Sequence, residues 1–307
     1  MIFEEFLKEL RQKEIVITFS DGKIQYSGPE ENITPELITK LKEHKVGLIK
    51  WAWPKESRNI IPINSEGSGT PFIFLECFNL SNLLSSYFGA DQPVYASYNA
   101  SWTTGEKVKH SDVLSFVGDY VDQLKNGLND GAYILGGHSF GGTLAYEMAL
   151  QLQNSGYEVP LVILFDTVSP KPFKSISLHS GLSHLVKIVY EMTVRRLWRF
   201  IKIFGYDSYF LLLDSLPELL RRNYITTKYS TMNSKYRPGK FNGDLLLFRS
   251  DQISSITKDL YGWEGIAGKI HLVKLTGDHL TMFRGIENAE FIGNEIEKCL
   301  NDIRNSK

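Results

Sequence analysis

The sequence predicts an α/β protein with a mostly parallel sheet, a helical insertion and a small α+β unit ahead of the sheet. From Pro71 onwards, short apolar runs alternate with helical stretches, which is the pattern of buried parallel strands with helices on both faces. Between 170 and 239 this alternation gives way to helical sequence, as expected for a lid inserted into the sheet. The predicted strands are Phe72–Leu75, Val94–Tyr98, Tyr133–Gly136, Leu161–Phe165, Leu245–Phe248 and Ile270–Leu275.

Composition excludes several classes of protein. The formal net charge of the 307 residues is -1, so no global field attracts nucleic acid or anionic lipid. The two cysteines, Cys77 and Cys299, fit a reducing compartment, and the acidic start MIFEEFLKEL is unlike a secretory signal. Charges interrupt the apolar stretch Leu182–Phe204, which predicts an amphipathic helix and no membrane span. We therefore expect a cytoplasmic protein.

The first 53 residues predict a helix, a β-hairpin and a second helix. Apolar residues recur at helical spacing over residues 1–12, and alternation around Asp21-Gly22 indicates two strands joined by a tight turn. Thr34 followed by Pro35 is a helix start signal, and apolar positions continue to Trp51. This unit is close to the size limit for independent folding, so dimerisation through it would add stability.

The domain boundaries follow from these changes in the pattern of apolar residues along the chain. We expect a small domain over 1–53, a linker over 54–66, and a large domain over 67–307 that contains the lid at about 170–239. Residues 171–240 hold 13 Lys and Arg against 4 Asp and Glu. The excess is either a solvated helical face or a surface that receives an acidic partner or a phosphorylated substrate arm.

The stretch Gly137-His-Ser-Phe-Gly141 predicts a nucleophile at Ser139. An apolar strand precedes it and a helix-forming run follows, which is the context that the G-x-S-x-G nucleophile elbow of an α/β-hydrolase requires. Glycine at both ends avoids clashes at a very sharp turn. The backbone N–H of Phe140, at the start of the helix, is a predicted oxyanion donor.

A serine hydroxyl needs a base, and His279 is the predicted one. It lies in a turn just after the last apolar strand, where this chain order delivers its histidine. The acid that orients the imidazole has two candidates, Asp166 and Asp251, because each follows a buried strand. His138, next to the nucleophile in the elbow, is expected to point away from it.

At these residues the sequence resembles the thioesterase domains of nonribosomal peptide and polyketide synthetases. In chain-terminating members the acid follows the strand after the elbow helix, here Asp166, whereas in many proofreading members it follows the later strand, here Asp251. The resemblance favours Asp166. The matching stretches are Pro71-Phe-Ile-Phe, Asp91-Gln-Pro-Val-Tyr, Gly136-Gly-His-Ser-Phe-Gly-Gly-Thr-Leu-Ala-Tyr-Glu-Met-Ala, Leu164-Phe-Asp-Thr, Tyr236-Arg-Pro-Gly-Lys-Phe-Asn-Gly, Leu247-Phe-Arg-Ser and Gly277-Asp-His-Leu-Thr-Met.

The first fifty residues resemble a second family, the TubC-type N-terminal docking domains of such synthetases. The similarity lies in the order of elements, Asp21-Gly22, Pro29 and Ile33-Thr-Pro-Glu-Leu37. These domains use a hairpin edge to pair with the C-terminal tail of an upstream subunit. The unpaired backbone N–H and C=O groups of a strand edge can pair with a partner strand, which is consistent with such a docking role.

Together the two resemblances imply a free-standing thioesterase recruited to an assembly line. The acyl chain would arrive on the phosphopantetheine arm of a partner carrier protein, with no metal and no permanently bound cofactor. Ser139 would attack the thioester, and release would follow by hydrolysis or cyclisation. A second oxyanion donor would come from the loop after Leu75, which we place at Phe78.

The predicted oxyanion loop departs from the family pattern. This loop is usually rich in glycine in family members, whereas here it reads Leu75-Glu-Cys-Phe-Asn-Leu-Ser81.

The sequence leaves other functions open. The alternatives are an editing thioesterase, an esterase of free small esters, and an inactive hydrolase fold that serves as a docking adaptor.

Overall fold

The structure is a computed structural model. The chain forms two compact units, Met1–Arg58 and Asn59–Lys307. It describes residues 3–305 apart from 21–22, 45–47, 49–59, 66, 90, 98, 100, 126–130, 171–194, 252–259, 280 and 284–285. Within that part of the chain, no helix is long and apolar enough to cross a membrane.

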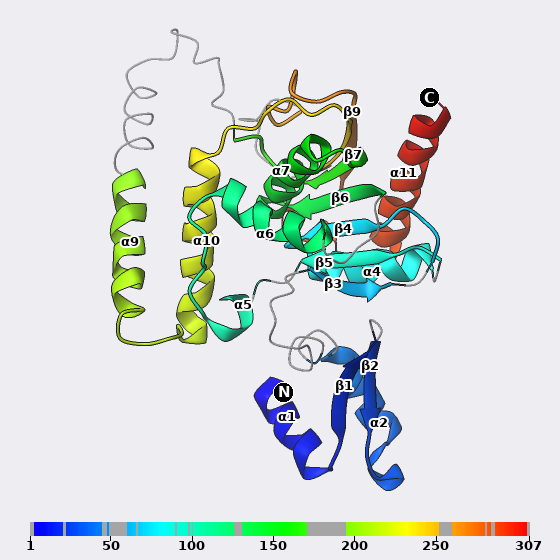
Figure 1. Ribbon diagram of the computed structural model, residues 1–307, viewed down its shortest axis with the longest axis vertical. Helices are drawn as coiled ribbons and strands as arrows, with labels where there is room; N and C mark the ends of the chain where they lie inside the picture. Colours follow the sequence, from blue (N-terminus) through cyan, green and yellow to red (C-terminus); the bar gives the residue numbers. More distant parts are fainter. Residues whose placement is uncertain are drawn as a thin grey trace. The chain divides into compact units, whose positions relative to one another are not determined.

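The first unit has the predicted helix, hairpin and helix (Figure 1). Helix α1 spans Phe3–Gln12, strands β1 (Val16–Ser20) and β2 (Lys23–Ser27) pair antiparallel, and a 3-10 turn, η1 (Glu30–Asn32), precedes α2 (Pro35–Glu43). Thr34 caps α2, because its hydroxyl accepts the N–H of Leu37 at 3.2 Å. The predicted turn residues, Asp21 and Gly22, lie outside the described residues, as does much of the stretch that we expected to continue α2 to Trp51. The core of the unit consists of Phe6, Leu10, Ile15, Ile17, Leu37, Leu41 and Leu48.

The second unit is an α/β-hydrolase fold built on a seven-stranded sheet in the order β3-β5-β4-β6-β7-β8-β9. Strand β3 pairs antiparallel with β5, and the remaining pairs are parallel. The strands span Ile60–Asn64 (β3), Phe72–Leu75 (β4), Val94–Ser97 (β5), Ala132–His138 (β6), Glu158–Phe165 (β7), Asp244–Ser250 (β8) and Ile270–Leu275 (β9).

Strand β3 corrects the expected linker of 54–66. Its Ile60 and Ile61 are buried, and the second compact unit already begins at Asn59. Pro62 made this stretch look like a connecting segment. A proline is tolerated in an edge strand because one side of that strand makes no ladder hydrogen bonds, and β3 is the edge strand.

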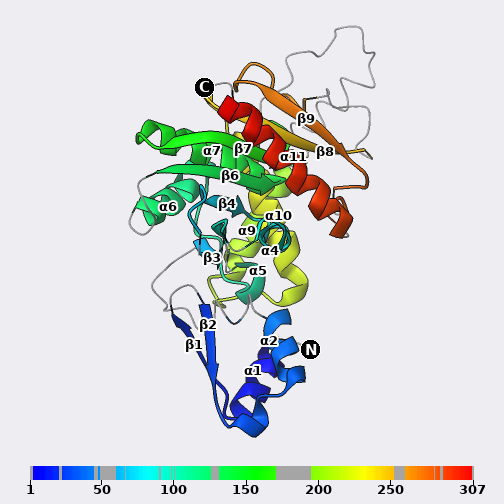
Figure 2. The same cartoon turned by 90° about the vertical axis from the view of Figure 1, so that its right-hand side faces the viewer.

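Helices cover both faces of the sheet, as Figures 1 and 2 show. Because successive strand residues point to opposite faces, Leu135, Val162 and Leu164 pack in one core cluster with α6 and α7, whereas Ile134, Leu161 and Ile163 pack in the other with α4 and α11. The helices span Phe78–Phe88 (α4), Ser101–Thr104 (α5), Val113–Lys125 (α6), Phe140–Asn154 (α7), Arg195–Tyr209 (α9), Glu218–Lys235 (α10) and Ile286–Asn305 (α11).

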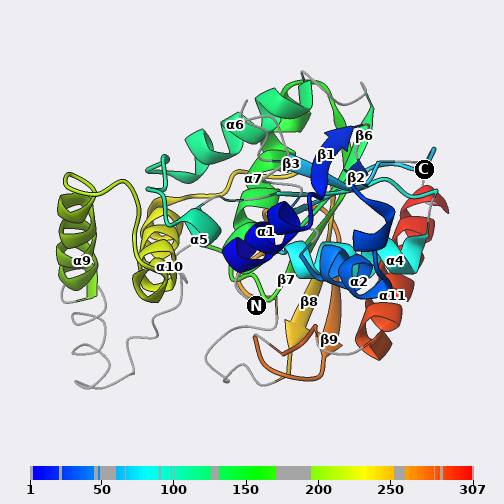
Figure 3. The same ribbon diagram turned by 90° about the horizontal axis from the view of Figure 1, so that it is seen from below.

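The lid contributes two helices that lie side by side, α9 and α10 (Figures 1 and 3). Helix α10 lies against the body of the unit, where the hydroxyl of Thr143 on α7 donates to Asn233 at 3.0 Å. The predicted amphipathic helix over 182–204 falls partly outside the described residues. Its described part, α9, leaves Leu197, Ile201 and Phe204 exposed.

Parallel pairing places the carboxyl ends of β4, β6, β7, β8 and β9 at one edge of the sheet. The residues that follow those ends are Glu76, Ser139, Asp166, Asp251 and the turn with His279. In parallel sheets ligands bind at this edge.

Candidate active site

Ser139 occupies a strained turn between β6 and α7. Its φ is 56° and its ψ is −117°, a conformation that non-glycine residues rarely adopt outside functional sites. Two backbone hydrogen bonds hold the turn. Ser139 N–H donates to Phe165 O at the end of β7 at 2.9 Å, and Gly142 N–H donates to Ser139 O at 3.2 Å. The nucleophile therefore stands at the carboxyl edge of the sheet, half-buried.

The two glycines of the elbow are required by close approach of the backbone. A Cβ added to Gly137 would lie 2.2 Å from the carbonyl carbon of Gly141, and one added to Gly141 would lie 2.1 Å from Leu75 O. Both distances are shorter than van der Waals contact, and the atoms met belong to backbone that cannot move aside easily. Glycine at both positions is therefore a steric requirement, as the sequence predicts.

We expect Gly141→Ala to destabilise the protein by about 1–3 kcal/mol and to lower activity, because α7 must move away from β4. Gly118→Ala is the matched control. Gly118 lies inside α6 with open space around its Cβ position, and alanine there should raise stability by about 0.5–1 kcal/mol. Chemical denaturation of both variants measures the difference. Equal stability of the two variants would contradict the steric account.

His279 and Asp166 are brought together from 113 residues apart. His279 Nδ1 lies 3.3 Å from Asp166 Oδ2. With the proton on Nδ1, the other ring nitrogen is the basic one, which is the tautomer that a general base requires. The imidazole is 40% exposed and the carboxylate is fully buried, so the pair is reachable on the histidine side only.

Asp166 is held by three further donors. Ser250 Oγ donates to Oδ2 at 2.6 Å, and Ser250 N–H and Tyr261 Oη donate to Oδ1 at 2.7 and 3.1 Å. Burial raises the pKa of Asp166, but the hydrogen bonds from His279, Ser250 and Tyr261 outweigh it and hold that pKa below its usual 3.8. The carboxylate is therefore ionised at neutral pH and oriented toward the imidazole.

Asp251, the alternative acid, has a different contact. Its Oδ1 accepts the N–H of Gly277 at 3.0 Å, and its own N–H donates to Leu275 O at 2.9 Å. These bonds hold the backbone of the turn that carries His279. Asp278 forms local bonds with Thr281 within the same turn. The assignment of Asp166 as the acid stays a prediction, now with a described contact behind it.

His138 lies beside His279, and its expected direction away from Ser139 stays a prediction. Its ring centroid lies 4.3 Å from that of His279 and 4.9 Å from that of Phe283. Burial, followed by the nearby His279, lowers the pKa of His138 to about 4, so the ring is neutral and forms a wall beside the base. The sequence did not predict the contact between His138 and His279, because that contact depends on the path of the turn after β9.

The two predicted oxyanion donors lie at helix N-termini. Phe140 is the first residue of α7 and Phe78 the first residue of α4, and the N–H groups of a first helical turn have no intrahelical partner. A Cβ on Gly141 would lie 2.1 Å from Leu75 O and 2.9 Å from Glu76 Cβ, so the first turn of α7 packs against the end of β4. The donor roles of Phe140 and Phe78 remain predictions.

Other chemistries have less support among the described residues. Cys77 and Cys299 are buried free thiols, and burial raises the pKa of each to about 12, so neither is a thiolate nucleophile. No group of three or more histidine, cysteine, aspartate or glutamate side chains that could hold a metal ion occurs in the part of the chain that the structure describes.

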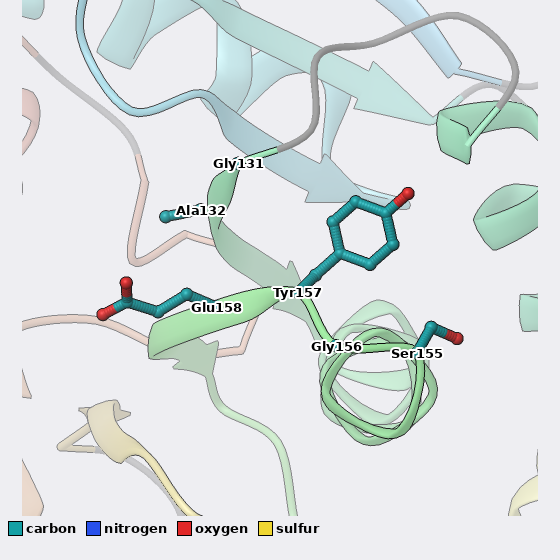
Figure 4. A pocket seen from close by; sticks show the side chains of 6 residues that line it. All are labelled: Gly131, Ala132, Ser155, Gly156, Tyr157 and Glu158. Atoms are coloured by element: carbon teal, nitrogen blue, oxygen red, sulfur yellow. The ribbon is translucent and has the colours of Figure 1, made fainter.

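A surface pocket of about 510 Å³ lies elsewhere on the large unit (Figure 4). It is lined at the amino ends of β6 and β7 by Gly131, Ala132, Ser155, Gly156, Tyr157 and Glu158. These ends are at the opposite edge of the sheet from Ser139. The pocket therefore does not belong to the site described here.

Two family profiles match the chain. The thioesterase domain matches residues 82–299, and the TubC N-terminal docking domain matches residues 3–51. Similar curated proteins include malpibaldin synthetase of Mortierella alpina, 27% identical over 63% of this chain, and chondramide synthase cmdD of Chondromyces crocatus, 30% identical over 36%. The chain spans only 3% of the length of either relative.

Solved structures show the same fold at low sequence identity. The NocB thioesterase domain in covalent complex with a fluorophosphonate nocardicin G analogue is 18% identical, with a TM-score of 0.55 over 79% of this chain and 100% of that one. The thioesterase domain SrfTE, described for cyclisation of the lipopeptide antibiotic surfactin, is 17% identical, with a TM-score of 0.53 over 81% and 99%.

Proposed function

Because the chain belongs to the thioesterase domain family, we propose that it releases an acyl, peptidyl or polyketide chain from a carrier-protein thioester through an acyl-serine intermediate. The observation that carries this proposal is the His279–Asp166 contact at the sheet edge that also presents Ser139 in a strained strand-to-helix turn. In the proposal Ser139 is the nucleophile, His279 is the base and Asp166 is the acid that orients the base.

The proposed reaction has two halves. His279 takes the proton of Ser139 as the oxygen attacks the thioester carbonyl, and the backbone N–H groups of Phe140 and Phe78 hold the oxyanion. Collapse breaks the carbon–sulfur bond, and the proton from His279 leaves with the phosphopantetheine thiol. Water or a nucleophile on the acyl group itself then attacks the acyl-serine ester while His279 takes its proton. The ester C–O bond breaks, and His279 returns the proton to the oxygen of Ser139.

Turnover of synthetic acyl-pantetheine thioesters tests this proposal, with product masses read directly. A linear acid indicates hydrolysis, and a product lighter by one water indicates cyclisation. Matched oxygen esters of the same acyl group are the control for a small-ester esterase, since a preference for the oxygen ester would contradict the proposal. An editing enzyme would accept short, unrelated acyl groups at rates similar to a full-length chain.

The N-terminal unit supports recruitment to a synthetase. Its β1 and β2 form a two-stranded sheet, which leaves an unpaired edge on each strand within the described residues. We propose that the C-terminal tail of an upstream subunit adds a strand at one of these edges. A carrier protein of that subunit would then be tethered to the chain that carries Ser139. We also propose self-association of the N-terminal unit.

Tyr26→Ala should weaken binding of the correct tail peptide about 10-fold, since exposed tyrosines are frequent hot spots. Tyr26 lies on β2 with 40% of its surface exposed. Calorimetric titration of the full chain with tail peptides of candidate upstream subunits measures the change. Turnover of small pantetheine thioesters is the control and should stay at the wild-type rate. A parallel fall in both would contradict a docking role.

A further inference from the structure

Glu76 stands where the sequence departs from the glycine-rich loop of its relatives. It directly follows β4, and its φ of 54° lies in the left-handed region that favours glycine. A non-glycine residue is strained there and persists only where its surroundings impose that conformation. Its own N–H is engaged, donating to Ser97 Oγ at 2.8 Å, so Glu76 supplies no oxyanion donor itself.

The carboxylate of Glu76 joins three elements. Its Oε2 accepts the hydroxyl of Tyr229 on α10 at 2.8 Å and the indole N–H of Trp102 on α5 at 3.0 Å. Its Oε1 is buried without a hydrogen-bond partner among the described residues. Burial raises the pKa of Glu76, partly offset by the two donors. For stability alone an apolar or glycine residue would serve better here.

Tyr229 connects this carboxylate to the nucleophile elbow. Its ring is stacked on that of Phe140, with centroids 4.3 Å apart and planes at 26°. Phe140 carries the predicted first oxyanion donor, and Glu76 lies in the loop that leads to the predicted second donor at Phe78. Glu76 is therefore linked to both predicted donors, to Phe78 along the backbone of the loop and to Phe140 through the ring of Tyr229.

We propose that Glu76 is a positioning residue that sets the two oxyanion donors relative to each other and ties them to lid helix α10. Glu76 does not touch the reacting atoms. It acts by fixing the loop after β4 and the ring of Tyr229 beneath Phe140. The inference rests on the proposed acyl-serine chemistry, but it concerns the oxyanion position, which any reagent that attacks Ser139 would use.

The test compares Glu76→Gly and Glu76→Gln by two readouts. One is the rate of phosphonylation of Ser139 by an alkyl fluorophosphonate, whose P=O oxygen must enter the oxyanion position. The other is kcat and KM on an acyl-pantetheine thioester. Glycine relieves the backbone strain, so folding is expected to be retained. Glutamine keeps an oxygen that can accept from both Trp102 and Tyr229.

We expect Glu76→Gly to slow phosphonylation and to lower kcat by about 10- to 100-fold with little change in KM, because losing one donor outright costs about 10²–10³. Glu76→Gln should stay within about 3-fold of wild type. Tyr229→Phe should lower kcat without adding to the Glu76→Gly loss, since both remove one connection. Wild-type rates in Glu76→Gly would overturn the proposal.

Glu147→Gln is the matched control for a merely structural carboxylate. Glu147 is also buried, and it accepts a tyrosine hydroxyl, from Tyr236 at 2.5 Å, further along α7. A rate loss in Glu147→Gln as large as that in Glu76→Gly, with an equal loss of unfolding free energy, would overturn the positioning role. If wild type reacts with the fluorophosphonate but turns over no thioester, the proposed function fails, and the phosphonylation rates still decide the role of Glu76.

Discussion

Ser139→Ala is expected to lower kcat on acyl-pantetheine thioesters by about 10⁶-fold, as removal of the nucleophile does in other serine hydrolases. The hydroxyl is the only group of the protein that forms a bond to the acyl carbon in this proposal. Because Cys77 and Cys299 are buried thiols with raised pKa values, they offer no replacement nucleophile. The variant should still bind substrate, since the alanine methyl fits wherever the serine Cβ does.

Intact-protein mass spectrometry after incubation with the thioester gives the clearest measurement. Wild type should gain the acyl mass and the alanine variant should not. Ser155→Ala is the matched control, because Ser155 lies at the far end of α7 and its hydroxyl donates only to Gln151 O among the described contacts. Acyl labelling of Ser139→Ala would defeat the assignment. Failure of wild type to react with a serine-directed phosphonate would favour the docking adaptor.

Asp166→Asn should lower kcat by about 10⁴-fold, whereas Asp251→Asn should cost less than about 10-fold. An amide at 166 can donate to Nδ1, which favours the tautomer with its proton on the other nitrogen and removes the base. At 251 the amide oxygen can still accept the N–H of Gly277, so the turn that carries His279 is retained. Steady-state kinetics at pH 7 measures both variants.

The pKa of Asp166 makes this comparison clean. Because that pKa is held below its usual value in the folded protein, the carboxylate is ionised throughout the neutral range, so wild type carries the charged acid at the pH of the measurement. Melting temperatures of both variants serve as the control. They show whether a lower kcat results from partial unfolding or from loss of the carboxylate that orients His279. The opposite ranking, with Asp251→Asn the inactive variant, would move the acid to the position that the resemblance associates with proofreading members.

The sequence by itself determined the features that depend on near neighbours. The parallel strands follow from runs of apolar residues, and the elbow follows from glycines whose Cβ would meet backbone at 2.1–2.2 Å. Such constraints act between residues close in the chain or within one strand-turn-helix unit, so they leave a readable pattern. The TubC match at 3–51 and the thioesterase match at 82–299 were anticipated for the same reason.

Only the tertiary structure decided which side chains meet. Asp166 contacts His279 across 113 residues and Glu76 contacts Tyr229 across 153, and no local pattern encodes either contact. Strand β3 was missed because its proline is acceptable only at an edge, and edge position is a property of the whole sheet. The ring of His138 lies against His279 because of the path of the turn after β9. Side-chain direction at a site depends on packing between distant elements, which the sequence records only as residue type.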